Sequence, residues 1–308
     1  MIYRCTKDEV ISPSQYFARN GEKIFENNNS FCHVDRNNDV LYVDEGFDLS
    51  SIHNVAGEIS ENFTGAFKKM IMRNNCDFEK NSIVQIKKLT KETPIVIGGC
   101  GRSGTTLMLS ILGAHSKIFA IPEETYAFYP NPLRLQRLSS QISELPTGVK
   151  WCEKTPKNIL AYKKILNIFD DDVKIINMIR DGRDVITSKH PNGPGKYWVN
   201  KQRWIEDNQS LISNPSILTV KFEDLIRDPE STLLKVCNHI GLDFEIQLLN
   251  YQSKTNVLKN IAWKDTAKPI GLRNSLSHKR TEKDNKIIED FMADPQALKL
   301  MNQFGYLR

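Results

Sequence analysis

The feature that most constrains this chain lies at residues 94–106, which read PIVIGGCGRSGTT. The β-branched run at 95–97 is typical of a buried strand. A loop rich in glycine follows, and from Thr105 the sequence TTLMLSILGA has the apolar spacing of a helix. This order predicts an anion-binding loop, because free backbone N–H groups and the positive end of the helix dipole face the same point.

The loop has the spacing of a nucleotide P-loop, G-x-x-x-x-G-K-[ST], but with one departure. Its glycines stand at Gly99 and Gly104, and Thr105 replaces the lysine that reaches the β- and γ-phosphates. Arg102 offers instead a planar guanidinium that suits a phosphate or a sulfonate. A glycine-rich turn without a ligand is the alternative, and the strand before and the helix after the loop favour the anion site.

Length and composition indicate a globular protein. The chain has 308 residues, 40% apolar and 26% charged, enough for one large α/β domain with an appendage. The net charge of +5 suits small anionic ligands and is too weak to indicate nucleic-acid binding. No apolar run approaches the ~18 residues of a membrane span, and the six scattered cysteines form no CxxC pair, so we expect no metal site.

One of these cysteines, Cys100, lies inside the loop and is a candidate nucleophile. No histidine stands near it in the sequence, and small residues commonly fill such loops, so we expect no nucleophilic role.

Two sections with different patterns divide the chain. Residues 1–93 are polar and irregular, and we assign them to an appendage of unknown role. Within it, FCHV and VLYVD flank a turn at 36–39 and predict a hairpin, and 52–72 has helical spacing. Residues 94–308 form the second predicted domain.

Strand and helix patterns alternate after residue 94. Strands are predicted at 95–98, 173–179 and 216–222, and helices at 105–114, near 131–142, at 157–168 and at 229–240. The fold class is therefore α/β, a P-loop-type parallel sheet covered by helices on both faces, with an N-terminal appendage. Ligands bind such sheets at the carboxyl ends of the strands, so the glycine loop and the turn after 173–179 are expected to share one ligand.

Three segments carry candidate site residues, each with a plainer alternative. Arg180 opens RDGRDVITS directly after a strand, where a salt-bridged turn is equally compatible. Lys154 lies in WCEKTP, where an exposed surface lysine is the alternative. Glu123 and Glu124 lie in IPEETY, where an acidic pair at a helix N-terminus is the alternative.

The segment PIVIGGCGRSGTTLM resembles the 5′-phosphosulfate loop of the PAPS-dependent sulfotransferases, especially the tyrosylprotein branch and its bacterial relatives. The resemblance extends from Pro94 to the C-terminus. It implies that the loop binds the 5′-phosphosulfate of PAPS, with these residues as ligands: Gly101, Arg102, Ser103, Gly104, Thr105 and Thr106. It further implies that Arg180 and Ser188, which lies two turns into the expected helix, hold the 3′-phosphate, with Arg183 as a further candidate.

The same resemblance suggests the catalytic residues. WCEKTP is similar to the NKDP segment of the tyrosylprotein branch, which places Lys154 over the sulfuryl group although Glu153 and Thr155 depart from that pattern. EET places the general base at Glu124, and one extra residue after the loop arginine leaves Glu123 open. Arg102 completes the catalytic set. Other branches use a histidine, for which His190 is a second choice, whereas we expect His115 to be structural.

Two segments near the C-terminus also resemble parts of the sulfotransferases. KDTAKPIGLRNS resembles the loop that closes over the nucleotide, which makes Lys268 and Arg273 candidate phosphate ligands. The terminal LKLMNQFGYLR resembles the closing helix, with Phe304 and Tyr306 predicted in the core. Trp198 and Trp204 are candidates for an adenine pocket, with a place in the core as the alternative.

The sequence therefore predicts in-line transfer of the sulfuryl group of PAPS to a hydroxyl or amine, with 3′,5′-ADP as product and no metal. A kinase with a degenerate P-loop and a non-catalytic nucleotide-binding protein remain as alternatives. The acceptor is open among a small molecule, a glycan and a tyrosine-containing polypeptide; no nucleic-acid partner or membrane span is expected, and a homodimer stays open. The N-terminus lacks the apolar core of a signal peptide, so the expected location is cytoplasmic, or the Golgi lumen if an anchor was trimmed.

Overall fold

The computed structural model describes residues 81–128, 133–190, 193–255, 257, 270 and 280–307, together with four strands among the first 44 residues. The chain divides into two compact units, Met1–Lys88 with Pro130–Ser140, and Leu89–Tyr129 with Gln141–Arg308. The predicted domain boundary at residue 93 stays a prediction. Within the described residues, no helix is long and apolar enough to cross a membrane.

The first unit contains a four-stranded sheet in the order β1-β4-β3-β2. Its strands are β1 (Ile2–Cys5), β2 (Ile24–Asn27), β3 (Ser30–Asp35) and β4 (Val40–Asp44). β3 and β4 pair antiparallel, with Cys32 opposite Val43, which confirms the predicted hairpin. Helix α5 (Leu133–Ile142) matches the helix expected near 131–142. The helix expected at 52–72 lies outside the described residues.

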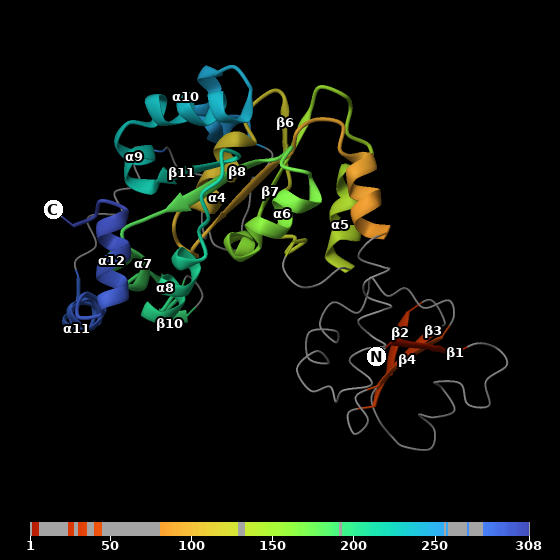
Figure 1. Ribbon diagram of the computed structural model, residues 1–308, viewed down its shortest axis with the longest axis horizontal. Coiled ribbons are helices and arrows are strands. Elements are labelled where there is room, and N and C mark those ends of the chain that lie inside the picture. The colour runs from red at the N-terminus through yellow and green to blue at the C-terminus, as the bar shows by residue number, and fades with distance from the viewer. Residues whose placement is uncertain are drawn as a thin grey trace. The chain divides into compact units, whose positions relative to one another are not determined.

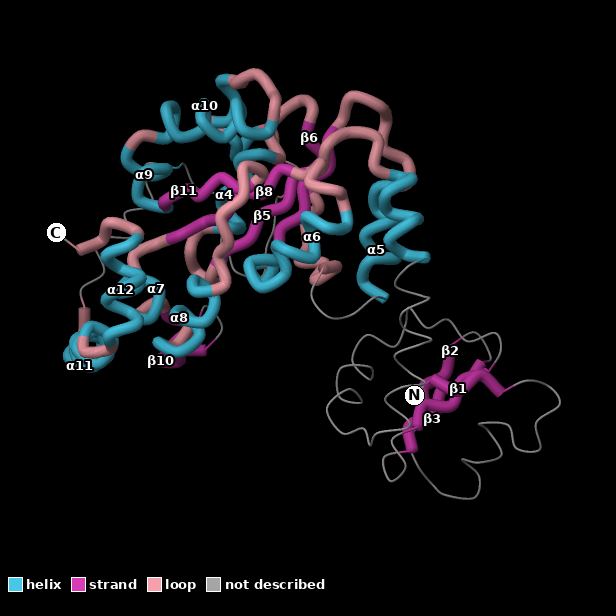
Figure 2. The backbone as a smooth tube through the Cα atoms, in the orientation of Figure 1, coloured by secondary structure: helices cyan, strands magenta, loops and turns pink. Residues whose placement is uncertain are grey.

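The second unit is built on a five-stranded sheet in the order β11-β8-β5-β7-β6, in which every neighbouring pair is parallel (Figures 1 and 2). The strands are β5 (Ile95–Gly99), β6 (Ile118–Ala120), β7 (Lys150–Lys154), β8 (Lys174–Ile179) and β11 (Ile217–Lys221). The α/β class and the parallel sheet are confirmed. The sequence analysis missed β6 and β7, because runs of three and five residues give a weak periodic signal.

Helices cover both faces of this sheet (Figure 1). The helices are α4 (Thr105–Leu112), η2 (Pro156–Ala161), α6 (Tyr162–Ile168), α7 (Gly182–Ile186), α8 (Lys201–Gln209), α9 (Phe222–Arg227), α10 (Pro229–Ile240), η3 (Ile246–Leu248), η4 (Tyr251–Ser253), α11 (Glu282–Met292) and α12 (Pro295–Gln303). A small antiparallel pair, β9 (Lys189–His190) and β10 (Gly193–Tyr197), lies between α7 and α8 in the chain.

The alternation of side chains along β5 separates the two layers. Ile95 and Ile97 pack into the cluster that contains the apolar residues of α4 and α10. Gly98 points the other way, where an added Cβ would lie 2.5 Å from the hydroxyl of Tyr162 at the start of α6. A strand buried on both faces requires apolar residues at consecutive positions, which explains the unbroken run at 95–97.

Two predicted helices differ from the structure. The helix at 157–168 begins as the 3-10 helix η2, with Pro156 at its first position, before α6 continues it. The helix after RDGR is α7, which ends at Ile186, so the prediction that Ser188 lies two turns into a helix is wrong. Beyond the helix end, the carbonyl of Ser188 accepts a hydrogen bond from the N–H of Trp198 at 3.0 Å.

The C-terminal part packs as a second apolar cluster. Phe304, which follows α12, is 9% exposed and confirms its predicted place in the core, and Tyr306 is partly buried beside it. Trp204 of α8 is fully buried against Phe291 of α11, with ring centroids 5.1 Å apart, so it belongs to the core and not to an open pocket.

Gly182, the first residue of α7, is the position where this packing leaves no room for a side chain. An added Cβ would lie 2.4 Å from the Phe291 ring. We expect Gly182→Ala to lower the free energy of unfolding by about 1 to 3 kcal/mol, the usual cost of overpacking. Gly101→Ala is the control, because its Cβ would make ordinary contacts at 3.5 Å or more. Urea unfolding measures both, and equal stabilities would contradict the packing.

Candidate functional site

The candidate residues all follow the carboxyl ends of parallel strands. The glycine loop follows β5, Arg180 follows β8, Lys154 ends β7, and Glu124 comes four residues after the end of β6. After β5 the chain forms β6 and β7, which lie on one side of β5 in the strand order, and after β8 it forms β11, which lies on the opposite side. The gap between β5 and β8 is therefore the topological switch point, where open α/β sheets bind their ligands.

The loop after β5 has the backbone of an anion site. Arg102 and Gly104 both have left-handed φ angles, 70° and 92°. At Gly104 the conformation requires glycine, because a Cβ would also lie 2.5 Å from the Phe222 ring. Helix α4 begins at Thr105 with no side-chain cap and no acidic residue in its first turn, which leaves its first N–H groups to an external acceptor.

Ser103 supplies a further donor in this loop. Its side chain is 1% exposed, and its hydroxyl has no hydrogen-bond partner among the described residues. Since buried hydroxyl groups are normally satisfied, this hydroxyl is available to a ligand or a bound water at the loop.

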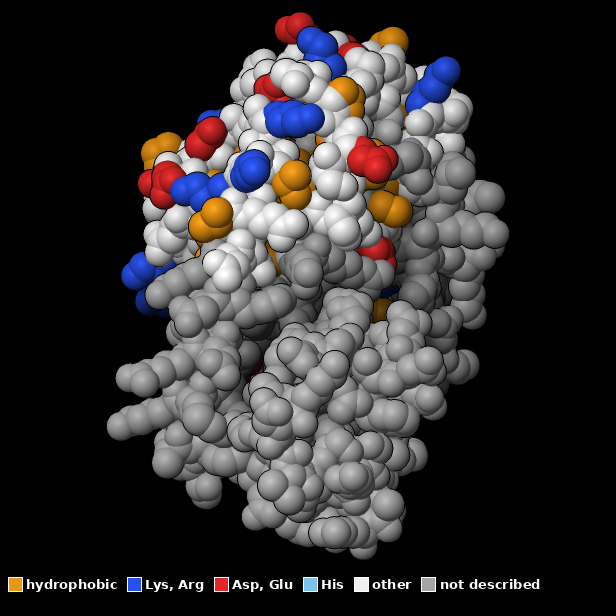
Figure 3. Space-filling view, turned by 90° about the vertical axis from the view of Figure 1, so that its right-hand side faces the viewer, with side chains coloured by type: hydrophobic (Ala, Val, Ile, Leu, Met, Phe, Trp, Pro, Cys, Tyr) orange, Lys and Arg blue, Asp and Glu red, His pale blue; other side chains and the backbone are white. Residues whose placement is uncertain are grey.

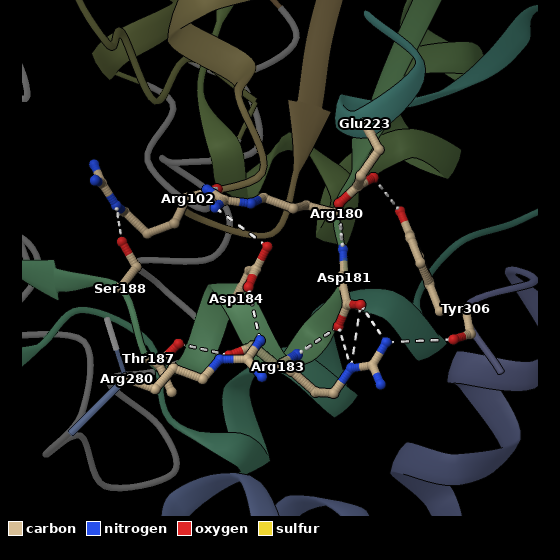
Figure 4. A network of polar contacts seen from close by, with 10 residues as sticks. All are labelled: Arg102, Arg180, Asp181, Arg183, Asp184, Thr187, Ser188, Glu223, Arg280 and Tyr306. Carbon is tan, nitrogen blue, oxygen red and sulfur yellow. Dashed lines mark hydrogen bonds and ion pairs between the residues drawn. The ribbon is translucent and has the colours of Figure 1, made fainter. Parts of the chain in front are cut away.

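Arg102 and Ser188 are brought together although 86 residues separate them. The Nε of Arg102 donates to the Oγ of Ser188 at 2.8 Å, as Figure 4 shows. The Arg102 guanidinium also lies over the ring of Trp198, 5.6 Å from its centroid. Trp198 is half-buried at this position, so it lines the candidate site whereas Trp204 does not.

Arg180 reaches the backbone of the same loop at Arg102 (Figure 4). Its Nη1 donates to the carbonyl of Arg102 at 3.2 Å, and its Nη2 is 3.6 Å from Asp184. Its guanidinium lies over the Phe222 ring at 4.7 Å, and its buried Nε has no partner among the described residues. The Oδ1 of Asp184 also accepts a hydrogen bond from the Nη2 of Arg280 at 3.2 Å, so Arg180 and Arg280 share one carboxylate.

Arg183 has a different environment from Arg102 and Arg180. Its guanidinium and its backbone N–H both donate to Asp181, and the hydrogen bonds of the guanidinium raise the pKa of Arg183. Thr187 donates back to the carbonyl of Arg183. Both arginines of the turn are therefore paired with a carboxylate, Arg183 with Asp181 and Arg180 with Asp184, and Arg180 also contacts the loop through the carbonyl of Arg102.

Glu223 of α9 fixes this turn to the C-terminal segment. It accepts the N–H of Asp181 at 3.0 Å and the hydroxyl of Tyr306 at 2.9 Å (Figure 4). Burial and the neighbouring carboxylate raise the pKa of Tyr306, so its hydroxyl stays a donor. No sequence motif indicated Glu223, because its partners are distant in the chain.

Lys154 and Glu124 form a direct ion pair. The Nζ of Lys154 is 2.6 Å from the Oε1 of Glu124, and the lysine side chain is 0% exposed whereas the glutamate is 32% exposed. The surface-lysine alternative is therefore excluded. Glu123 instead accepts a hydrogen bond from Gln141, so Glu124 is the acidic residue of this pair that the structure places at Lys154.

Glu153 is fully buried directly beside this pair. Its Oε1 accepts the hydroxyls of Thr125 at 2.8 Å and Thr155 at 2.6 Å, and its Oε2 accepts the amide of Asn158 at 2.7 Å. Burial raises the pKa of the Glu153 carboxyl, and the hydrogen bonds oppose this shift. The resemblance marked Glu153 only as a departure from a pattern.

The structure also describes the environments of Cys100 and His115, two other candidates from the sequence. Cys100 is fully buried, and burial together with Asp207 raises its pKa, which is the opposite of an activated thiolate. His115 is buried and its Nε2 lies 2.9 Å from the carbonyl of Asp243, as expected of a structural histidine. Lys268 and Arg273 lie outside the described residues, as does the side chain of His190.

Comparison with known proteins gives the family. The sequence model of the sulfotransferase family matches residues 94–143 and 134–246. The matched span runs from β5 to the start of η3 and includes the glycine loop, the Lys154–Glu124 pair and Arg180. The chain belongs to the sulfotransferase family, a family of transferase enzymes.

Similar solved structures have low identities. The sulfotransferase domain of the Synechococcus PCC 7002 olefin synthase is 18% identical with a TM-score of 0.48, over 70% of this chain and 97% of that domain. The sulfotransferase domain from the curacin biosynthetic pathway is 17% identical with a TM-score of 0.46, over 70% and 98%. Mouse sulfotransferase SULT7A1, solved in complex with PAP, is 13% identical with a TM-score of 0.43, over 73% and 94%. No curated protein sequence matches the chain.

The buried carboxyl of Glu153 predicts a pH-dependent stability difference between the wild type and Glu153→Gln. Because its pKa is raised in the folded protein, its contribution is fully present below the ordinary pKa of glutamate and is lost as the pH rises through the raised value. The wild type should therefore lose stability relative to the variant from about pH 4.5 upward. Urea unfolding across this range measures the difference, and a difference constant with pH would contradict the assignment.

Proposed function

We propose that this protein transfers the sulfuryl group of PAPS to a hydroxyl or amine acceptor. The observation that carries the proposal is the meeting of Arg102, Ser188 and Arg180 at the N-terminus of α4. Two cationic side chains, a hydroxyl and a helix N-terminus at one point suit a ligand with more than one anionic group.

The two halves of the site divide the cofactor between them. The loop residues Gly101 to Thr106, with the orphaned hydroxyl of Ser103, would hold the 5′-phosphosulfate. Arg180 and Ser188 would hold the 3′-phosphate, for which Arg180 has an unpartnered Nε. Lys268 remains a proposed phosphate ligand on the sequence resemblance alone.

Glu124 is the proposed general base. The acceptor oxygen or nitrogen attacks sulfur in line, the bond from sulfur to the phosphate oxygen breaks, and Glu124 takes the acceptor proton. Its partial exposure, 32%, leaves the carboxylate accessible to an acceptor while Lys154 holds one of its oxygens.

Lys154 is the proposed stabiliser of the leaving group, with Arg102. Negative charge grows on the departing phosphate oxygen, and a buried ammonium stabilises that charge more strongly than an exposed one. The ammonium has three donors, so it can bind Glu124 and a phosphate oxygen at the same time.

A kinase with a degenerate P-loop is the second candidate. Thr105 occupies the position of the phosphate-binding lysine and is buried at the start of α4, which leaves the γ-phosphate of a nucleoside triphosphate without its usual cation. This observation favours PAPS, and the binding experiment below separates the two ligands.

The acceptor class stays open. On the described part of the face in Figure 3, Lys and Arg side chains are interspersed with Asp and Glu side chains. This part of the surface therefore offers no single-sign field for a strongly charged partner. The proposal covers small molecules, glycans and tyrosine-containing polypeptides alike.

Binding of 3′,5′-ADP and two substitutions test the function together. At a concentration 100-fold above its Kd, 3′,5′-ADP should raise the Tm by about 5 to 10 °C, whereas ATP with Mg²⁺ should not. Arg180→Ala should weaken 3′,5′-ADP binding about 10- to 100-fold, because it removes a charge-assisted contact. Glu124→Gln should keep binding and lower turnover of PAPS about 10²- to 10⁴-fold.

Arg227→Ala is the matched control, because Arg227 is 76% exposed and pairs with Asp224. It should leave 3′,5′-ADP binding unchanged. A Tm shift with ATP and Mg²⁺ but not with 3′,5′-ADP would replace the sulfotransferase proposal with phosphoryl transfer. Equal effects of Arg180→Ala and Glu124→Gln on binding would overturn the division of roles.

A further inference from the structure

Tyr126 has an unusual backbone conformation beside the proposed base. Its φ angle of 52° lies in the left-handed region, which bulky residues rarely adopt and which costs of order 1 kcal/mol or more. Such strain persists only where surrounding contacts impose it, and it concentrates at functional sites. Tyr126 is half-buried, two residues after Glu124.

The contacts that impose this conformation come from the end of β7. The N–H of Tyr126 donates to the Oγ1 of Thr155 at 3.1 Å. Thr155 in turn donates its hydroxyl to the buried carboxylate of Glu153, so its oxygen is oriented to accept the N–H of Tyr126. The strained residue is thus held to the strand that carries Lys154.

The result of this conformation is a hydrogen bond to the proposed base. The hydroxyl of Tyr126 donates to the Oε2 of Glu124 at 2.9 Å, while Lys154 donates to the Oε1 at 2.6 Å. The two donors hold both oxygens of one carboxylate and fix its rotation. Each carboxylate oxygen can accept two hydrogen bonds, so each can still take the proton of an acceptor hydroxyl or amine.

We propose that Tyr126 is the positioning residue of the general base: its phenol holds the second oxygen of Glu124 in the orientation needed for proton transfer. This inference rests on the proposed function. An ordinary tertiary hydrogen bond would not require a strained backbone next to an ion pair with a fully buried lysine.

The consequence is a selective loss of turnover when the phenol oxygen is removed. A misplacement of about 1 Å at a reacting group can cost 10²-fold in rate. The residues proposed to bind the nucleotide, in the loop and at Arg180, follow β5 and β8, whereas Tyr126 follows β6. The effect should therefore appear in kcat and not in the affinity for PAPS.

The first experiment compares Tyr126→Phe with the wild type, using radiolabelled PAPS and 2-naphthol or N-acetyltyrosinamide as acceptors. We expect kcat to fall about 10- to 100-fold, with the KM for PAPS and the Kd for 3′,5′-ADP within twofold of wild type. Tyr162→Phe is the matched control, because its hydroxyl donates to Asn177 at 2.8 Å inside the core. The control should keep the wild-type kcat, and an unchanged kcat in Tyr126→Phe would overturn the proposal.

The second experiment needs no acceptor. The Tm shifts of Tyr126→Phe, Glu124→Gln and the double variant should be non-additive, because the two side chains share one hydrogen bond. Additive shifts would overturn the positioning role. A wild type that neither binds 3′,5′-ADP nor transfers from PAPS would overturn the proposed function, while the coupling measured by melting decides the Tyr126–Glu124 contact separately.

Discussion

One buried carboxylate, that of Glu153, joins the parts of this site. It accepts hydrogen bonds from Thr125 on the segment that carries Glu124, and from Thr155 beside Lys154. Its other oxygen accepts a hydrogen bond from the side-chain amide of Asn158, which also donates to the carbonyl of Ile97 in β5. Three segments that are distant in sequence are therefore held in register by one group.

The polarity of these hydrogen bonds leaves little freedom. Thr125 and Thr155 each accept a backbone N–H and donate their own hydroxyl to Glu153. The Asn158 amide must donate both to Glu153 and to the strand. A glutamine at 153 would place its own donor against one of these groups, and a buried donor without an acceptor costs about 1 to 3 kcal/mol. The arrangement thus depends on a carboxyl group in a place where burial alone disfavours its charge.

Local patterns were sufficient to predict the parallel α/β class and the strands β5, β8 and β11, but not β6 and β7. The strand, glycine loop and helix at 94–112, and Arg180 directly after β8, are contiguous in sequence and need no tertiary information. The expectation that the loop and the turn after β8 lie together also follows from parallel strands that end at one edge, whereas the hydrogen bond between Arg102 and Ser188 was not predicted.

The parts that were missed depend on long-range contacts. Helix α7 ends before Ser188, whose carbonyl accepts the N–H of Trp198, ten residues further on. The roles of Glu153, Tyr126 and Glu223 arise from partners on other strands and helices. A single sequence holds no record of those pairings, so these residues read as departures from a motif or as ordinary polar positions.

The central claim is that the loop after β5 and the turn after β8 hold two ends of one ligand. A crystal structure of the protein with 3′,5′-ADP tests it most directly. The account predicts the 5′-phosphate at the N-terminus of α4, with the 3′-phosphate bound by Arg180 and Ser188. A nucleotide bound elsewhere, or a 3′-phosphate that contacts neither Arg180 nor Ser188, would contradict it.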